Sequence, residues 1–332
     1  MRYSISSRFR GTILGLAIGE NLGKSSSVKQ YPYYTATSPT STQPQPLNQI
    51  GTQNLSLDAN PQIVSMVILG MRTLIQKGKF VFEDWRHAFG GKDLNLGRLN
   101  SSSAPELINI IATLPIALFY HENKTELRQN LQLAMVAVGQ DKPDCRDGAL
   151  ALGYAIALCV QAKLNRSELI SQTIAFLGEP QTQVAQKLLQ VRTLLEQNAG
   201  LERAVTALDT DDRLSSHIAL AFYSCLSTAE DFRLSVKRAA AKSAQPQFTS
   251  AMTGALSGAY NGISSIPATL RLPLSGNDKK PVLASGMTTK IEMLKLCDAL
   301  VGVWSGVYDR ANQPADLTQI AAIAAPRVMR RR

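Results

Sequence analysis

Residues 243–267 read Ser243-Ala-Gln-Pro-Gln-Phe-Thr-Ser-Ala-Met-Thr-Gly-Ala-Leu-Ser-Gly-Ala-Tyr-Asn-Gly-Ile-Ser-Ser-Ile-Pro267. Small residues cluster within a few helical turns of this stretch, among them Gly254, Gly258 and Gly262. Each glycine inside a helix costs up to about 1 kcal/mol, so the cluster indicates that something must come close to the backbone. Two interpretations are open here: tight packing against another helix, or the approach of a ligand.

Apolar residues recur at helical spacing along most of the chain, and the pattern predicts helices without strands or internal repeats. Residues 24–54, 80–100 and 268–285 are predicted to be loops or connecting segments. The predicted helices lie within residues 8–23, 58–75, 104–120, 125–138, 140–158, 167–176, 181–197, 201–208, 215–227, 231–241, 243–267, 290–308 and 315–325.

The chain is basic, with a formal net charge of +10 over 332 residues. Its basic residues are dispersed except in the tail Arg327–Arg332, and no helix-turn-helix, zinc-finger or aromatic RNA-binding motif is present. One hypothesis is therefore an interaction protein that acts through this tail.

The four cysteines show no paired metal-ligand spacing. Cys159, Cys225 and Cys297 lie among apolar or small residues and are predicted to be buried free thiols, whereas Cys145 lies among charged residues and is expected to be more exposed. With no signal sequence and no apolar run of membrane-spanning length, we expect a cytoplasmic protein without a membrane association.

The segment Gly254–Gly262 followed by Ile266-Pro267 resembles the C-terminal signature of the ADP-ribosylglycohydrolase family. A second segment, Gly11-Thr-Ile-Leu-Gly-Leu-Ala-Ile-Gly-Glu-Asn-Leu-Gly23, resembles the family's opening motif Gly-x-x-x-Gly-x-Ala-x-Gly-Asp-Ala-Leu-Gly. This resemblance implies an all-α fold, a compact orthogonal array of helices. It would form one domain over residues 1–326 with the long polar loop 24–54, a loop at 268–285 and the basic tail 327–332.

The resemblance also implies a cleft in which acidic motifs hold two divalent metal ions. The family's Asp-x-Asp-Thr motif falls on Gln245, Pro246, Gln247 and Phe248, so both of its carboxylates are missing. Hard cations need several oxygen ligands that converge on one point, and the loss predicts that tight Mg²⁺ or Mn²⁺ binding is abolished. The cleft positions that match family motifs are Glu20, Asp58, Asn60, Gln140, Gln245 and Gln247, of which Asp58 is the metal-ligand candidate.

Two more hypotheses follow from the resemblance. The first is a non-catalytic protein, with no cofactor, that binds an ADP-ribose-like ligand or a protein partner in the old cleft. The second is an active Mg²⁺- or Mn²⁺-dependent hydrolase of ADP-ribosyl linkages with relocated ligands, drawn from Glu20, Asp58, Asp209, Asp211 and Asp212. The segment Asp209–Arg213 imitates the metal motif, but its place before a predicted helix favours an acidic helix start.

Overall fold

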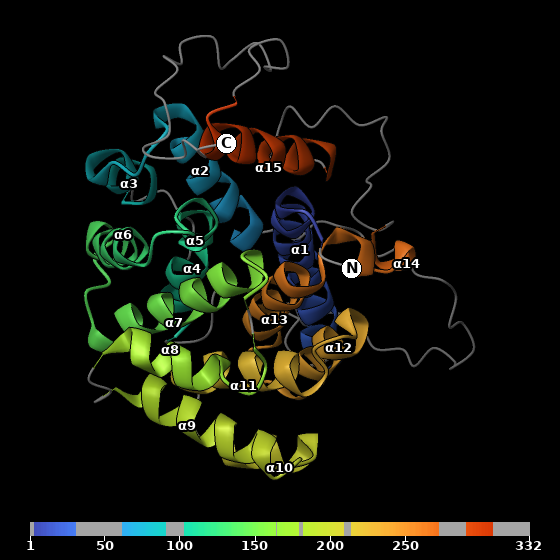
Figure 1. Cartoon of the computed structure of the whole chain (residues 1–332). Coiled ribbons are helices and arrows are strands. Elements are labelled where there is room, and N and C mark those ends of the chain that lie inside the picture. Colours follow the sequence, from blue (N-terminus) through green and yellow to red (C-terminus); the bar gives the residue numbers. More distant parts are fainter. Residues whose placement is uncertain are drawn as a thin grey trace, which may run out of the picture.

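The computed structural model describes residues 3–30, 62–90, 103–163, 165–178, 182–208, 214–271 and 290–307, and these form helices and turns without a strand. Figure 1 shows α13 near the middle of the molecule with the other helices crossing around it, so the predicted all-α fold is confirmed. The elements are α1 (Ile5–Gln30), α2 (Gln62–Lys77), α3 (Phe82–Phe89), α4 (Ala104–Ala112), α5 (Leu114–Phe119), α6 (Lys124–Ala137), α7 (Pro143–Val160), α8 (Leu169–Leu177), α9 (Gln183–Glu196), α10 (Leu201–Leu208), α11 (Leu214–Ser227), α12 (Phe232–Lys242), α13 (Pro246–Asn261), the 3₁₀ turn η1 (Ile263–Ser265), α14 (Ala268–Arg271) and α15 (Lys290–Ser305).

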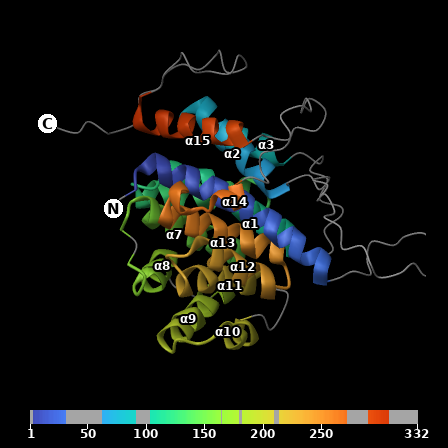
Figure 2. The ribbon, with the colours of Figure 1, turned by 90° about the vertical axis from the view of Figure 1, so that its right-hand side faces the viewer.

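Helices α1 and α13 pack antiparallel along the small residues of both (Figure 2). A methyl group on Gly11 would lie 2.3 Å from the carbonyl oxygen of Gly258, and one on Gly19 would lie 2.0 Å from that of Ser250. Such distances leave no room for a side chain, and backbone atoms cannot rotate out of the way. The small residues of 243–267 therefore serve tight helix packing, the first of the two interpretations.

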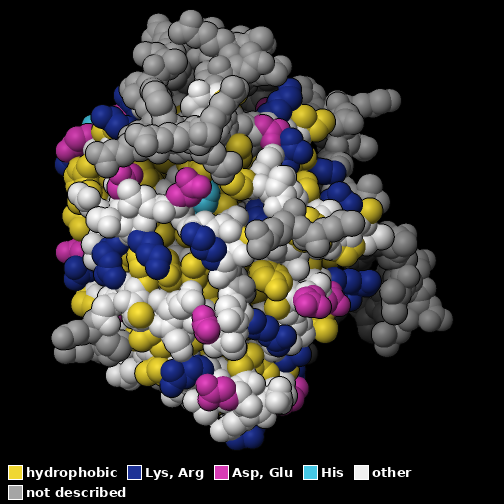
Figure 3. Space-filling view, in the orientation of Figure 1, with side chains coloured by type: hydrophobic (Ala, Val, Ile, Leu, Met, Phe, Trp, Pro, Cys, Tyr) yellow, Lys and Arg dark blue, Asp and Glu magenta, His cyan; other side chains and the backbone are white. Residues whose placement is uncertain are grey.

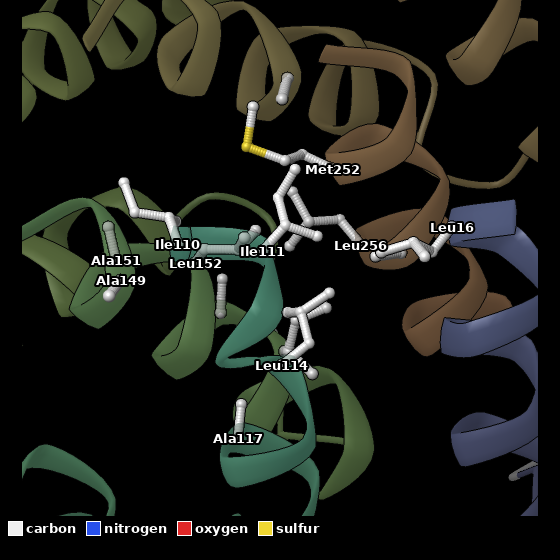
Figure 4. Packing of buried hydrophobic residues seen from close by; sticks show 14 of the residues in the cluster. Leu16, Ile110, Ile111, Leu114, Ala117, Ala149, Ala151, Leu152, Met252 and Leu256 are labelled. Carbon is white, nitrogen blue, oxygen red and sulfur yellow. The ribbon is translucent and has the colours of Figure 1, made fainter. Parts of the chain in front are cut away.

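The apolar core is continuous around this helix pair. Ile111 of α4, Leu114 of α5, Leu16 of α1 and both Met252 and Leu256 of α13 point into one space and are at most 2% exposed (Figure 4). Full burial of a side chain of this size contributes about 1.5–3 kcal/mol. The core thus connects α1 to α4 and α5, which follow it by about one hundred residues, and to α13, which follows it by more than two hundred.

Arg8 joins the ends of two core helices. Its Nη1 group donates to the carbonyl oxygens of Cys159 at the end of α7, at 2.5 Å, and of Ala259 and Tyr260 at the end of α13, at 3.0 and 2.8 Å. The last carbonyl groups of a helix lack partners within it and carry partial negative charge. One buried guanidinium therefore satisfies two helix C-termini, although burial lowers its pKa from the usual value.

Several predicted boundaries are wrong. The loop predicted over 268–285 begins with helix α14 (Ala268–Arg271). Helix α1 continues to Gln30, so the first residues of the predicted loop 24–54 are helical. The connecting segment 80–100 contains α3, whose Trp85 is buried with its ring 4.5 Å from that of Phe89. The helix expected over 104–120 is interrupted at Thr113, because Pro115 in the next turn has no N–H to continue the hydrogen-bond pattern.

The expectation that Cys145 is more exposed is also wrong. Its side chain lies on the inner side of the first turn of α7 and is fully buried, and burial raises its pKa to about 11. Cys159, Cys225 and Cys297 are buried free thiols, as predicted. In the described part of the chain, no helix is both long and apolar enough to cross a membrane. Most of the loop 24–54, most of 268–285, the segment Asp209–Arg213, the predicted helix 315–325 and the tail lie outside the described residues.

Candidate functional site

Glu20 lies on α1 and is completely buried. Its carboxylate accepts hydrogen bonds from the backbone N–H groups of Ile63, at 3.3 Å, and Val64, at 3.0 Å, in the first turn of α2. The first N–H groups of a helix have no partner within the helix, and this end also attracts negative charge. Glu20 therefore caps α2 from a neighbouring helix.

A lysine neutralises this buried carboxylate. The Nζ atom of Lys24, one turn further along α1, lies 2.8 Å from Oε1 of Glu20. The Lys24 side chain keeps 20% of its surface exposed, whereas that of Glu20 keeps none. Burial of an unpaired polar group is costly, and the ion pair and the two N–H donors together offset the cost of burying the Glu20 side chain.

Gln247 completes the group. It lies in the first turn of α13, half-buried, and its Nε2 atom is 3.4 Å from Oε1 of Glu20. We name this group the Glu20 junction: Glu20, Lys24, Gln247 and the backbone of Ile63 and Val64. Two of the predicted cleft residues, Glu20 and Gln247, thus meet where α1, α2 and α13 converge.

The other predicted cleft residues are placed differently. Gln245 is the N-cap residue of α13, and its backbone N–H donates to the hydroxyl of Ser243 at 3.1 Å. Gln140 lies in the turn before α7, and no hydrogen bond between described residues joins it to Glu20. Asp58 and Asn60 lie outside the described residues, as do the alternative ligands Asp209, Asp211 and Asp212.

A buried polar cluster beside the start of α13 was not predicted from the sequence. The Ser243 hydroxyl lies 2.7 Å from the hydroxyl of Thr249 and 3.5 Å from Nδ1 of His217. A serine beside a histidine suggests nucleophilic chemistry, but all three side chains are at most 1% exposed. The cluster therefore serves the fold, by satisfying the N-terminus of α13. The signal available in the sequence was a serine three residues before a proline at a helix start.

The residues at the Glu20 junction can be tested against the dinuclear metal centre that the family resemblance implies. In residues 3–30, 62–90 and the later described segments, no three His, Cys, Asp or Glu side chains gather as they would around a metal ion. The junction offers one carboxylate, already engaged by four donors, and a glutamine amide. Mg²⁺ and Mn²⁺ prefer several converging carboxylate oxygens, so these described residues do not fit such a centre.

Comparison with known proteins gives three findings. The family profile described as ADP-ribosylglycohydrolase matches residues 1–309 of the chain. No curated protein matches the chain. Among solved structures, a chain of an "ADP-ribosylglycohydrolase-related protein complex" is similar in fold, with a TM-score of 0.56 and 16% identity, over 91% of this chain and 99% of the other.

Proposed function

This chain belongs to the ADP-ribosylglycohydrolase family, and we propose that it has lost the family's metal-dependent catalysis and acts as a binding or regulatory protein at the old cleft. The observation that carries the proposal is the contact between Lys24 and Glu20. The family's opening motif has an aspartate at position 20, and here a glutamate holds that position with a lysine ammonium 2.8 Å from its oxygen.

A divalent cation at this carboxylate would face the charge of Lys24. Two unit charges 4 Å apart interact with about 4 kcal/mol at an effective dielectric constant of 20, and a divalent ion doubles that cost. To avoid this repulsion, the Lys24 ammonium group would have to move away from Glu20. Glu20 would then be the one carboxylate of the junction that contacts the metal ion. The glutamines at 245 and 247 add neutral amides where the family has carboxylates, and neutral amides compensate less cationic charge.

The ligand that we propose is ADP-ribose-like and binds without a metal. Amide groups such as that of Gln247, which is half-buried at the start of α13, can donate to and accept from ribose hydroxyls. The N-terminal end of α13 adds a positive potential that favours phosphate. A protein partner in the same cleft is the second possibility.

Calorimetric titration with ADP-ribose, in EDTA and then in Mn²⁺, tests the proposal. We expect the same affinity in both buffers and no release of ADP-ribose from a modified arginine. Gln247→Ala should weaken binding by about ten-fold, the order of a lost hydrogen bond to a charged ligand. The matched control is Gln190→Ala, the same change at an exposed position of α9, far from α2 and α13 in Figure 1.

Metal-dependent release of ADP-ribose would overturn the loss of catalysis and would favour the hydrolase with relocated ligands. Equal losses in Gln247→Ala and Gln190→Ala would contradict the assignment of the Glu20 junction. Absence of binding in both buffers would reject the nucleotide-like ligand and direct the search to a protein partner.

A further inference from the structure

An open groove of about 690 Å³ lies between the start of α6, the end of α7 and α8. Its volume falls within the range of about 300–1,000 Å³ that is usual for small-molecule sites. We name it the basic groove. Its lining residues are Lys124, Thr125, Arg128, Tyr154, Leu158, Gln161, Lys163, Gln172, Ala175 and Phe176.

The groove is positively charged. Three cations line it, Lys124, Arg128 and Lys163, and no aspartate or glutamate does. No carboxylate among the described residues forms an ion pair with Lys124 or Lys163. Lysine and arginine side chains gather over α6 and α7 on this face of the molecule (Figure 3). The two lysines are thus available to an anionic ligand.

Two of the cations are held in place by aromatic rings. The rings of Tyr154 and Phe176 stack with centroids 4.2 Å apart and planes at 6°. The Nζ atom of Lys124 lies 5.3 Å from the Tyr154 centroid, and Cζ of Arg128 lies 4.7 Å from that of Phe176. Arg128 also donates to the Phe176 carbonyl oxygen. Cations fixed in this way lose little conformational entropy when a ligand binds.

We propose that the basic groove binds a small ligand that carries two or more linked phosphate groups. Three cations that line one groove suit a ligand with several closely spaced negative charges, and the guanidinium group of Arg128 favours phosphate oxygens. The ligand is either an inorganic oligophosphate or a nucleoside oligophosphate, which share this chemistry. A long nucleic acid would extend past the groove toward three carboxylates that do not line it, and their like charge disfavours such a ligand. Two of them, Glu122 and Glu126, flank Lys124 in the chain, and the third, Glu168, accepts a hydrogen bond from the Gln172 amide at 3.0 Å.

The basic groove is separate from the Glu20 junction. Leu158 and Gln161 lie at the end of α7, where Arg8 connects α7 to the C-terminal end of α13. Gln247 lies at the opposite, N-terminal end of α13. A helix of 16 residues is about 24 Å long, so a single small ligand does not reach both places.

Calorimetric titration of the full chain with pyrophosphate, at an ionic strength of about 0.15 M and without divalent metal, tests this proposal. We expect saturable binding that the double variant Lys124→Gln/Lys163→Gln weakens by about ten-fold or more, since two charge-assisted contacts are lost. The matched control Lys79→Gln/Lys237→Gln removes the same charge at two exposed positions of the chain. It should change the affinity by less than about two-fold, because salt screens distant charges. Thermal unfolding checks that both variants fold.

The outcomes separate this site from the proposed function. Gln247→Ala should leave pyrophosphate binding unchanged, and amide hydrogen exchange should show protection by pyrophosphate in α6 and α8. Tighter binding of ADP than of pyrophosphate, lost in Lys124→Gln/Lys163→Gln and kept in Gln247→Ala, identifies a nucleoside ligand of the groove, and equal binding identifies an inorganic one. No saturable binding, equal losses in both lysine pairs, or displacement of pyrophosphate by a more tightly bound single-stranded oligonucleotide would overturn the proposal.

Discussion

Gly15 of α1 and Gly254 of α13 lie against each other with no space for a side chain on either. A methyl group on Gly15 would be 2.2 Å from the carbonyl oxygen of Gly254, and one on Gly254 would be 2.1 Å from that of Gly15. The same contact recurs one turn away, between Gly11 and Gly258. Any side chain here must push the two central helices apart, together with the core that they carry.

We therefore expect Gly254→Ala to lower the free energy of unfolding by about 2–3 kcal/mol, the cost of overpacking a core. Helix propensity acts in the opposite direction, because alanine is better than glycine in a helix by about 1 kcal/mol. A net loss of stability in urea denaturation would thus be a clear sign of the steric clash.

The matched control is Gly200→Ala, since a methyl group on Gly200 meets nothing within 4 Å. This change should alter the free energy of unfolding by less than about 0.5 kcal/mol. If Gly254→Ala proves as mild as Gly200→Ala, then α1 and α13 are not packed as closely as described.

Arg8→Met should cost about 2–4 kcal/mol. The variant fills a similar volume but leaves the carbonyl groups of Cys159, Ala259 and Tyr260 without their shared donor, and unsatisfied buried groups cost about 1–3 kcal/mol. The control Arg86→Met removes an exposed arginine whose ion pair with Glu83 lies at the surface, where such pairs contribute about 0–1 kcal/mol. Equal effects in chemical denaturation would argue against a capping role for Arg8.

Acid should destabilise the protein in part through His121. This side chain is buried against Phe9 and Trp304, with ring centroids 5.7 and 4.8 Å away, and burial lowers its pKa from the ordinary value. The neutral form is therefore the native one, while the unfolded chain takes up a proton below about pH 6.5. The contribution of neutral His121 to the free energy of unfolding is therefore fully present above that pH. Below it, this contribution decreases by at most about 1.4 kcal/mol per pH unit.

His121→Gln should remove this pH dependence. The difference in the free energy of unfolding between the natural chain and the variant should therefore change between pH 7.5 and pH 5. Urea denaturation at several pH values measures it. His87→Gln, at an exposed position of α3, is the control. A gap for His121→Gln that stays constant over this range would show that His121 is not buried in its neutral form.

No cysteine should react in the native protein. All four are buried free thiols, and burial raises the pKa of Cys145 to about 11 and that of Cys225 to about 12. Because the thiolate is the reactive form, an aromatic disulfide reagent at pH 8 should label none within minutes and four in denaturant. Rapid labelling of the native protein that disappears in Cys145→Ser would show that Cys145 is exposed, as the sequence predicted.

Much of the fold was accessible from local pattern. The helical period is visible in the sequence, and the glycines of the segment 243–267 indicated that either a helix or a ligand comes close to the backbone. Segments with weak periodicity were misjudged. Lys24–Gln30 is polar and reads as loop, but it continues α1. The segment that holds α3 is short and surrounded by glycines, so its burial of Trp85 could not be foreseen.

The sequence by itself determined the helical class and the family resemblance, and it predicted that glutamines at 245 and 247 replace the family's aspartates. The tertiary structure alone decided the partners of the charged residues and the burial of Cys145. The physical reason is the separation along the chain: Glu20 meets Ile63 and Gln247, 43 and 227 residues away, and Arg8 meets Ala259, 251 residues away. A side chain's charge, exposure and chemistry depend on such distant neighbours, and no local pattern contains them.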